Sequence, residues 1–174
     1  FRMYKFRSMT DERDAEGNLL PDDVRLTEFG KKLRATSADE LPELINIFKG
    51  DMSVVGPRPQ LVRDMVFFTE EEMKRQRVYP GLTGLAQICG RNNITWKEKF
   101  AFDLQYIKDI NFFEDMRIIF RTVFKVSAQE DIATDGMETA EDYGDWLLRT
   151  GQIEKEEYDK KQAEAKKMLD EFEG

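Results

Sequence analysis

The chain has 174 residues, of which 40% are hydrophobic and 36% are charged. This composition is too apolar for a disordered chain and too charged for one buried in a membrane. There is no histidine, and Cys89 is the single cysteine, which excludes Ser-His-Asp and Cys-His catalysis, an intramolecular disulfide and cysteine-based zinc clusters. An enzyme of this composition must therefore rely on carboxylates and arginines.

The net charge of −8 is unevenly distributed. Residues 1–127 hold 21 Lys+Arg and 20 Asp+Glu, a net of +1, whereas residues 128–174 hold 6 and 15, a net of −9. We therefore expect a nearly neutral body over 1–127 and an acidic helical extension over 128–174. Nucleic acid is not an expected partner, because the body has neither the basic surplus nor a recognised motif for binding it.

In chain order, the first half predicts one strand and two short helices. Residues 3–9 alternate loosely and predict a strand or edge segment, and residues 10–25 predict a surface loop. Helices are expected over about 26–35 and 39–49, and the second has apolar residues at i, i+3, i+4 and i+7 before Gly50. A loop with a short extended piece follows, in which Pro57 and Pro59 stiffen the backbone around Arg58.

The second half is predicted to be mostly helical. Helices are expected over 60–78, 95–108 and 112–126, with a short strand at LAQI, residues 85–88, between turns. The extension predicts two further helices joined at Gly151.

The helix over 112–126 carries cations at a spacing of four, namely Arg117, Arg121 and Lys125, on an otherwise apolar sequence. One interpretation is a helix in a membrane interface, with its cations facing lipid phosphates. The other is a core helix with a solvated stripe.

Asp39 and Glu40 stand side by side where the 39–49 helix is expected to begin. One interpretation is structural, because Ser37 and Glu40 have the S-x-x-E spacing of a capping box. The other is catalytic. An aspartate kept ionised at a helix N-terminus can attack phosphorus and form an acyl phosphate, while the neighbouring glutamate takes a proton from a second acceptor. Arg34, Arg58 and Arg91 are candidate phosphate-binding cations, and Mg²⁺ on the carboxylates would be the usual additional cation.

The residues from about Tyr4 to Val126 resemble those of the bacterial sugar transferases, which are monotopic polyprenyl-phosphate phosphoglycosyl transferases. The resemblance rests on YKFRSM, TDERD, the block RLTEFGKKLRATSADELPELINIFKGDMSVVGPRPQL, YPGLTGLAQICGRN, and the W-x3-F-x2-D-x2-Y-I pattern of residues 96–107. The long middle block is highly specific.

The resemblance implies a mainly α fold with a small β element and a defined reaction. The family transfers a sugar 1-phosphate from a UDP-sugar to polyprenyl (undecaprenyl) phosphate, releasing UMP, as the first membrane step of glycan assembly. By resemblance, Asp39 is the covalent nucleophile and Mg²⁺ ligand, and Glu40 deprotonates the lipid phosphate. Arg34 and Arg58 match positions around the bound anions, and Arg91 is added from its place in the GRNN turn.

The resemblance also implies a location on the cytoplasmic face of the bacterial cell membrane. The family's hydrophobic N-terminal segment would precede Tyr4, so we expect this chain to be a soluble catalytic domain without its anchor. Other glycan assembly enzymes or a second copy of the chain are further expected partners. Two alternatives remain, a Mg²⁺-dependent phosphohydrolase and a non-catalytic membrane-associated scaffold.

Overall fold

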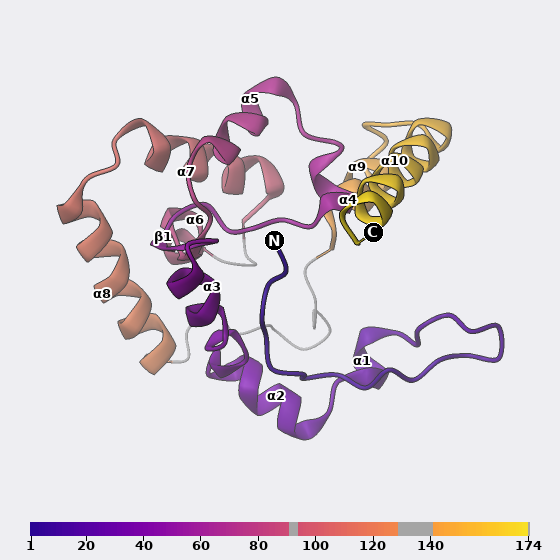
Figure 1. Cartoon of the computed structure of the whole chain (residues 1–174), viewed down its shortest axis with the longest axis horizontal. Helices are drawn as coiled ribbons and strands as arrows, with labels where there is room; N and C mark the ends of the chain where they lie inside the picture. The colour runs from indigo at the N-terminus through magenta and orange to yellow at the C-terminus, as the bar shows by residue number, and fades with distance from the viewer. Residues whose placement is uncertain (91–93, 129–140, 174) are drawn as a thin grey trace.

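The computed structural model describes residues 1–90, 94–128 and 141–173 (Figure 1). It is mainly helical with one small parallel sheet, as predicted. The sheet consists of β1 (Ser53–Val55) and β2 (Gly81–Thr83). The α-helices are α1 (Asp22–Arg25), α2 (Glu28–Ala35), α3 (Glu43–Lys49), α4 (Val62–Met65), α5 (Glu70–Met73), α6 (Leu85–Cys89), α7 (Trp96–Lys108), α8 (Phe112–Ala128), α9 (Tyr143–Arg149) and α10 (Lys155–Glu173), and the 3₁₀ turns are η1 (Ala38–Glu40) and η2 (Lys74–Arg77).

The sheet lies at the centre of one of two hydrophobic clusters. Ser53 pairs with Gly81 and Val55 with Thr83, and the strands approach so closely that a Cβ on Gly81 would lie 2.1 Å from the backbone nitrogen of Gly56. The first cluster consists of Val55, Leu85, Ile88, Tyr106 and Ile118, which are buried where α6, α7 and α8 meet β1. This packing fixes the start of the loop that carries Arg58.

The strand predicted at 85–88 is wrong. The preceding residues Gly81–Thr83 form β2 instead, and LAQI begins α6. Leu85, Ala86 and Ile88 are all buried. A run that buries three of its four residues lacks the alternation that would distinguish a strand from a short helix.

The N-terminal residues form no strand, contrary to the prediction for 3–9, and make one isolated bridge, between Met9 and Leu26. They run extended beside α3 and η1 instead. The N–H of Tyr4 donates to Asn46 Oδ1 at 3.0 Å, and that of Phe6 donates to the carbonyl of Asp39 at 2.9 Å. Lys5 lies between Tyr4 and Phe6 in the chain, so these two bonds place its side chain near the start of α3.

The single helix predicted over 60–78 is also wrong, because the segment divides into α4, α5 and η2. Thr69 and Glu72 form a capping box that begins α5. Such a cap requires a non-helical backbone at Thr69 and so interrupts the helix.

Helices α9 and α10 pack against α4 and α7 through the second hydrophobic cluster, which is centred on Phe67, Phe100, Tyr143 and Leu147. The rings of Tyr143 and Phe100 contact edge to face, with centroids 5.0 Å apart. The residues on both sides of the predicted boundary at 127 therefore share a hydrophobic cluster, and the division into two domains stays a prediction.

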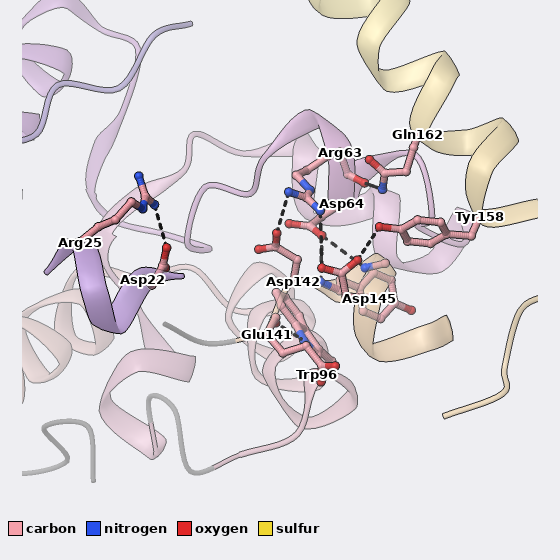
Figure 2. Close-up of polar contacts among 12 residues, drawn as sticks. Asp22, Arg25, Arg63, Asp64, Trp96, Glu141, Asp142, Asp145, Tyr158 and Gln162 are labelled. Carbon is pink, nitrogen blue, oxygen red and sulfur yellow. Dashed lines mark hydrogen bonds and ion pairs between the residues drawn. The ribbon is translucent and has the colours of Figure 1, made fainter. Parts of the chain in front are cut away.

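A group of polar side chains lies beside this cluster (Figure 2). Asp64 accepts hydrogen bonds from the backbone N–H groups of Tyr143 at 2.8 Å and Gly144 at 3.3 Å. Arg63 pairs with Asp142 at 3.2 Å. We call Arg63, Asp64, Asp142, Asp145 and Tyr158 the docking cluster, because they join α4 to α9 and α10.

Helix α8 lies on the side of the molecule opposite α9 and α10 (Figure 1). Ile118 is its one buried residue, whereas its large apolar side chains Phe112, Phe113, Phe120, Val123 and Phe124 are exposed. Helix α8 therefore contributes Ile118 to the first cluster, while most of its apolar face lies outside the core. The membrane-interface interpretation stays a prediction. Within the described ranges, no helix is long and apolar enough to cross a membrane.

Candidate active site

Asp39 and Glu40 lie in η1, between α2 and α3. The capping box predicted for Ser37 and Glu40 is absent, because Ser37 has a left-handed backbone with φ of 53° and its side chain makes no cap hydrogen bond. A left-handed conformation costs a non-glycine residue on the order of 1 kcal/mol or more. The strained turn at Ser37 directs the chain from α2 into η1, which leaves the two carboxylates ahead of α3 rather than in its first turn.

Glu40 is held by two cations from distant parts of the sequence. Its Oε1 accepts from Arg58 Nη2 at 2.6 Å and from Lys5 Nζ at 3.0 Å. Lys5 also lies 3.1 Å from Glu43 Oε1. The side chain of Glu40 is 16% exposed, whereas that of Arg58 is 43% exposed, so Arg58 remains accessible to a ligand. We call Lys5, Glu40, Glu43 and Arg58 the charge cluster.

The two glutamates of this cluster differ in pKa. Burial acts to raise the pKa of Glu40, but Arg58 and Lys5 outweigh it and lower the pKa to about 2. Burial raises the pKa of Glu43, and Lys5 only partly opposes this effect. Glu40 is therefore a fixed anion at neutral pH, and it keeps Arg58 charged.

Asp39 has a different environment. Its carbonyl accepts the N–H of Phe6 at 2.9 Å, but its half-buried carboxylate makes no hydrogen bond or ion pair with any described residue. It still acts electrostatically on Arg58. Burial acts to lower the pKa of Arg58, but Glu40, Glu43 and Asp39 together raise it. Asp39 is thus a carboxylate near a cation with its oxygens open to a new partner.

The predicted arginines divide between several places. Arg58 contacts Glu40, whereas Arg34 donates from Nε to Ser8 Oγ at 3.0 Å. Neither Asp39 nor Glu40 forms an ion pair with Arg34. Arg91 lies outside the described residues.

The residues present can be tested against the predicted Mg²⁺. The described part of the chain contains no group of three or more acidic or cysteine side chains suited to a metal ion. Mg²⁺ is usually bound through one or two carboxylates together with substrate phosphates and waters. Asp39 fits such a site because its carboxylate oxygens have no partner among the residues that the structure describes, whereas Glu40 Oε1 already has two cationic partners. The metal stays a prediction.

Lys5 and Glu43 were not predicted as members of this cluster. Glu43 follows Asp39 by four residues, a spacing that favours proximity on a helix. No local pattern marked Lys5, because it comes within reach of Glu40 only through the extended pairing of residues 4–6 with α3 and η1.

Comparison with known proteins agrees with the earlier resemblance. The model of the family described as "Bacterial sugar transferase" matches residues 1–129. The uncharacterized sugar transferase EpsL of Bacillus subtilis is 52% identical over 141 residues, covering 81% of this chain and 70% of its own length.

Two other relatives are longer proteins. The galactosyl transferase CpsE of Streptococcus agalactiae is 42% identical over 137 residues, covering 71% of this chain and 30% of its own length. The UDP-glucose:undecaprenyl-phosphate glucose-1-phosphate transferase of Klebsiella pneumoniae is also 42% identical over 137 residues, with 71% and 29% covered. The chain thus spans less than a third of either relative. On the match to the family model and to EpsL, this chain belongs to the bacterial sugar transferase family.

Proposed function

We propose that the chain transfers a sugar 1-phosphate from a UDP-sugar to a polyprenyl phosphate and releases UMP, through a phosphosugar bound covalently to Asp39. Family membership and the activity named for the Klebsiella pneumoniae relative support this reaction class. The observation that carries the assignment to Asp39 is that its carboxylate makes no hydrogen bond or ion pair with any described residue, while it acts electrostatically on the accessible Arg58.

The first half-reaction uses Asp39 as nucleophile. One carboxylate oxygen attacks the phosphorus that bears the sugar, the bond from that phosphorus to the UMP oxygen breaks, and UMP leaves. Arg58 stabilises the charge on the phosphate oxygens, because a guanidinium donates to two oxygens at once. In the second half-reaction, an oxygen of the lipid phosphate attacks the same phosphorus and releases the Asp39 carboxylate.

Glu40 takes the proton from the lipid phosphate in this scheme. With a pKa of about 2 it is too weak a base while Arg58 and Lys5 hold it, since a phosphate monoester loses its second proton at about pH 6. Substrate phosphates compete with Glu40 for Arg58 and Lys5. When the two cations bind phosphate instead of Glu40, the pKa of Glu40 rises toward that of the acceptor. Substrate binding thereby activates the base.

Asp39 would hold Mg²⁺ together with the substrate phosphates, and the metal would supply positive charge against theirs. In the protein itself, Lys5 and Arg58 orient the phosphates.

The location we propose is the cytoplasmic membrane interface. The exposed face of α8 carries four phenylalanines and a valine, and α3 exposes Leu44, Ile45 and Phe48, the last 96% exposed. Exposed apolar side chains on amphipathic helices bind at the boundary between headgroups and acyl chains. In this proposal, the acceptor phosphate at the membrane surface lies within reach of η1, the turn that precedes α3.

The test is a screen for UMP release from a panel of UDP-sugars with undecaprenyl phosphate. We expect one or more sugars to give UMP and lipid-linked sugar phosphate in equal amounts, and Asp39→Asn to abolish both. Wild-type turnover by Asp39→Asn would refute the nucleophile assignment. Sugar phosphate released without lipid, at a comparable rate, would instead identify a phosphohydrolase. Vesicle binding without turnover would identify a scaffold.

A further inference from the structure

Arg75 is a buried cation that the scheme above does not use. It lies in η2, far in sequence from Asp39, and is 3% exposed. Its guanidinium donates to Asp103 Oδ2 on α7 from Nε at 3.1 Å and from Nη2 at 2.6 Å. The rings of Phe68 and Phe100 lie 5.5 and 5.4 Å from its central carbon. Arg75 is therefore held rigidly on several sides.

The same Nη2 group also donates to the backbone carbonyl of Arg58, at 2.7 Å. This bond connects the core to the loop that presents Arg58 to Glu40. Pro57 and Pro59 restrict the backbone on either side of Arg58. The carbonyl of Pro57 also accepts the N–H of Gly81 at 2.9 Å, which ties the start of the loop to β2. The Arg75 bond ties the backbone of Arg58 itself to the buried Arg75–Asp103 pair, and so to α7.

We propose that Arg75 is a positioning residue, which holds the Arg58 backbone so that the Arg58 guanidinium meets the substrate phosphate. This inference rests on the proposed function and deepens it. Asp103 in turn orients Arg75, because both of its hydrogen bonds come from one edge of the guanidinium. Lysine cannot replace this arrangement, since an ammonium lacks the planar fork that reaches Asp103 and the Arg58 carbonyl together.

The variants that separate positioning from general stability are Arg75→Gln, Arg75→Lys and the matched control Arg77→Gln. Arg77 is an exposed cation in the same η2 turn. Arg75→Gln leaves Asp103 buried without its cation and is expected to destabilise the fold strongly. Arg75→Lys keeps a positive charge beside Asp103, so we expect it to fold. If Arg75→Gln does not fold, Arg75→Lys is the variant that tests the positioning role.

The first readout is kcat/KM for UMP release in a double-mutant cycle with Arg58→Ala. We expect Arg75→Lys to lower kcat/KM roughly 10- to 100-fold, as a misplacement of about 1 Å does. In the Arg58→Ala background the same change should lower it less than about threefold, because the group being positioned is gone. Equal losses in both backgrounds, or wild-type kcat/KM for a folded Arg75→Lys, would overturn the proposal.

The second readout does not depend on activity. In the wild-type protein the Arg58 Nε–H cross-peak in ¹⁵N-correlated NMR should be shifted and resolved, because its guanidinium is fixed by Glu40. In Arg75→Lys we expect it to move to the position of a free arginine, with no change in Arg77→Gln. If the wild-type protein released no UMP while this shift occurred, the proposed function would fail and the positioning role would stand. If the wild-type protein released UMP but the Arg58 signal were unchanged in Arg75→Lys, the positioning role would fail and the proposed function would stand.

Discussion

Glu40 and Asp64 are both carboxylates largely shielded from water, and each faces at least one arginine. Glu40 belongs to the charge cluster, where Lys5 and Arg58 lie against one of its oxygens. Asp64 belongs to the docking cluster, where Arg63 is shared with Asp142 and Asp145 (Figure 2). Their pKa values move apart, to about 2 for Glu40 and about 6 for Asp64.

The difference shows that the local balance of charge, and not burial alone, decides the state of these groups. Burial raises the pKa in both places. At Glu40 two cations overcome it. At Asp64 the neighbouring Asp142 adds to it, and the N–H groups of Tyr143 and Gly144 together with Arg63 oppose it only in part. The charge cluster balances two glutamates with two cations that can also bind phosphate. The docking cluster has one arginine for three aspartates, and its surplus of carboxylates is suited to capping a helix.

Among changes to these two clusters, the largest effect is expected from removing the Glu40 carboxylate. Glu40→Gln should lower kcat by roughly 10²- to 10⁴-fold, the usual contribution of a general base. The measurement is steady-state UMP release at saturating UDP-sugar. Glu28→Gln is the control, because Glu28 is an exposed carboxylate of α2 that pairs with Lys31 and lies outside the charge cluster. A Glu40→Gln variant as fast as this control would remove Glu40 from the mechanism.

The docking cluster should make stability fall as the pH rises. Since the pKa of Asp64 is raised from 3.8 to about 6 in the folded chain, the folded state binds the proton more tightly, and this contribution is lost between about pH 4 and pH 6. The wild-type free energy of unfolding should fall by on the order of 2 kcal/mol more than that of Asp64→Asn over this range. Urea denaturation at pH 4 and pH 7 measures it.

The exposed Asp23 provides the control for that comparison, as Asp23→Asn. Parallel pH profiles for the wild type and Asp64→Asn would mean that Asp64 is not the titrating group.

The charge cluster should show the opposite dependence on pH. The pKa of Glu40 is lowered from 4.5 to about 2, so its stabilising contribution is present above about pH 4.5 and is lost as the pH falls toward 2. Between pH 5 and pH 3 the stability advantage of the wild type over Glu40→Gln should shrink by somewhat under about 2 kcal/mol. The same urea titrations measure this, with Glu28→Gln again as control. An advantage that grew at low pH would reverse the assigned charge balance.

Much of the fold could be predicted from sequence because it depends on local patterns. The apolar spacing of 95–108 and of 112–126 indicates helices, and the structure has α7 and α8 there. Predictions failed where a local pattern competed with tertiary packing. Residues 3–9 alternate like a strand, but their backbone bonds to α3 and η1 rather than to a sheet. The short apolar run at 85–88 fits a helix as well as a strand.

The candidate site divides in the same way. Asp39, Glu40 and Arg58 could be proposed from motifs, and the structure brings Glu40 and Arg58 into contact. Lys5 and Arg75 could not, because each joins the site through pairing between segments far apart in sequence. The left-handed turn at Ser37 could not be predicted either, because the spacing of Ser37 and Glu40 matches a capping box.

The central claim is that Asp39 becomes bonded to a phosphosugar, and intact-protein mass spectrometry tests it most directly. The chain is incubated with its UDP-sugar and Mg²⁺ without lipid acceptor, and is then quenched in acid. We expect a mass increase equal to one sugar phosphate, with one equivalent of UMP released, reversal on addition of undecaprenyl phosphate, and no increase in Asp39→Asn. The account would be contradicted if the chain turned over with lipid present but gave neither adduct nor UMP burst without lipid. An adduct that persists in Asp39→Asn would also contradict it.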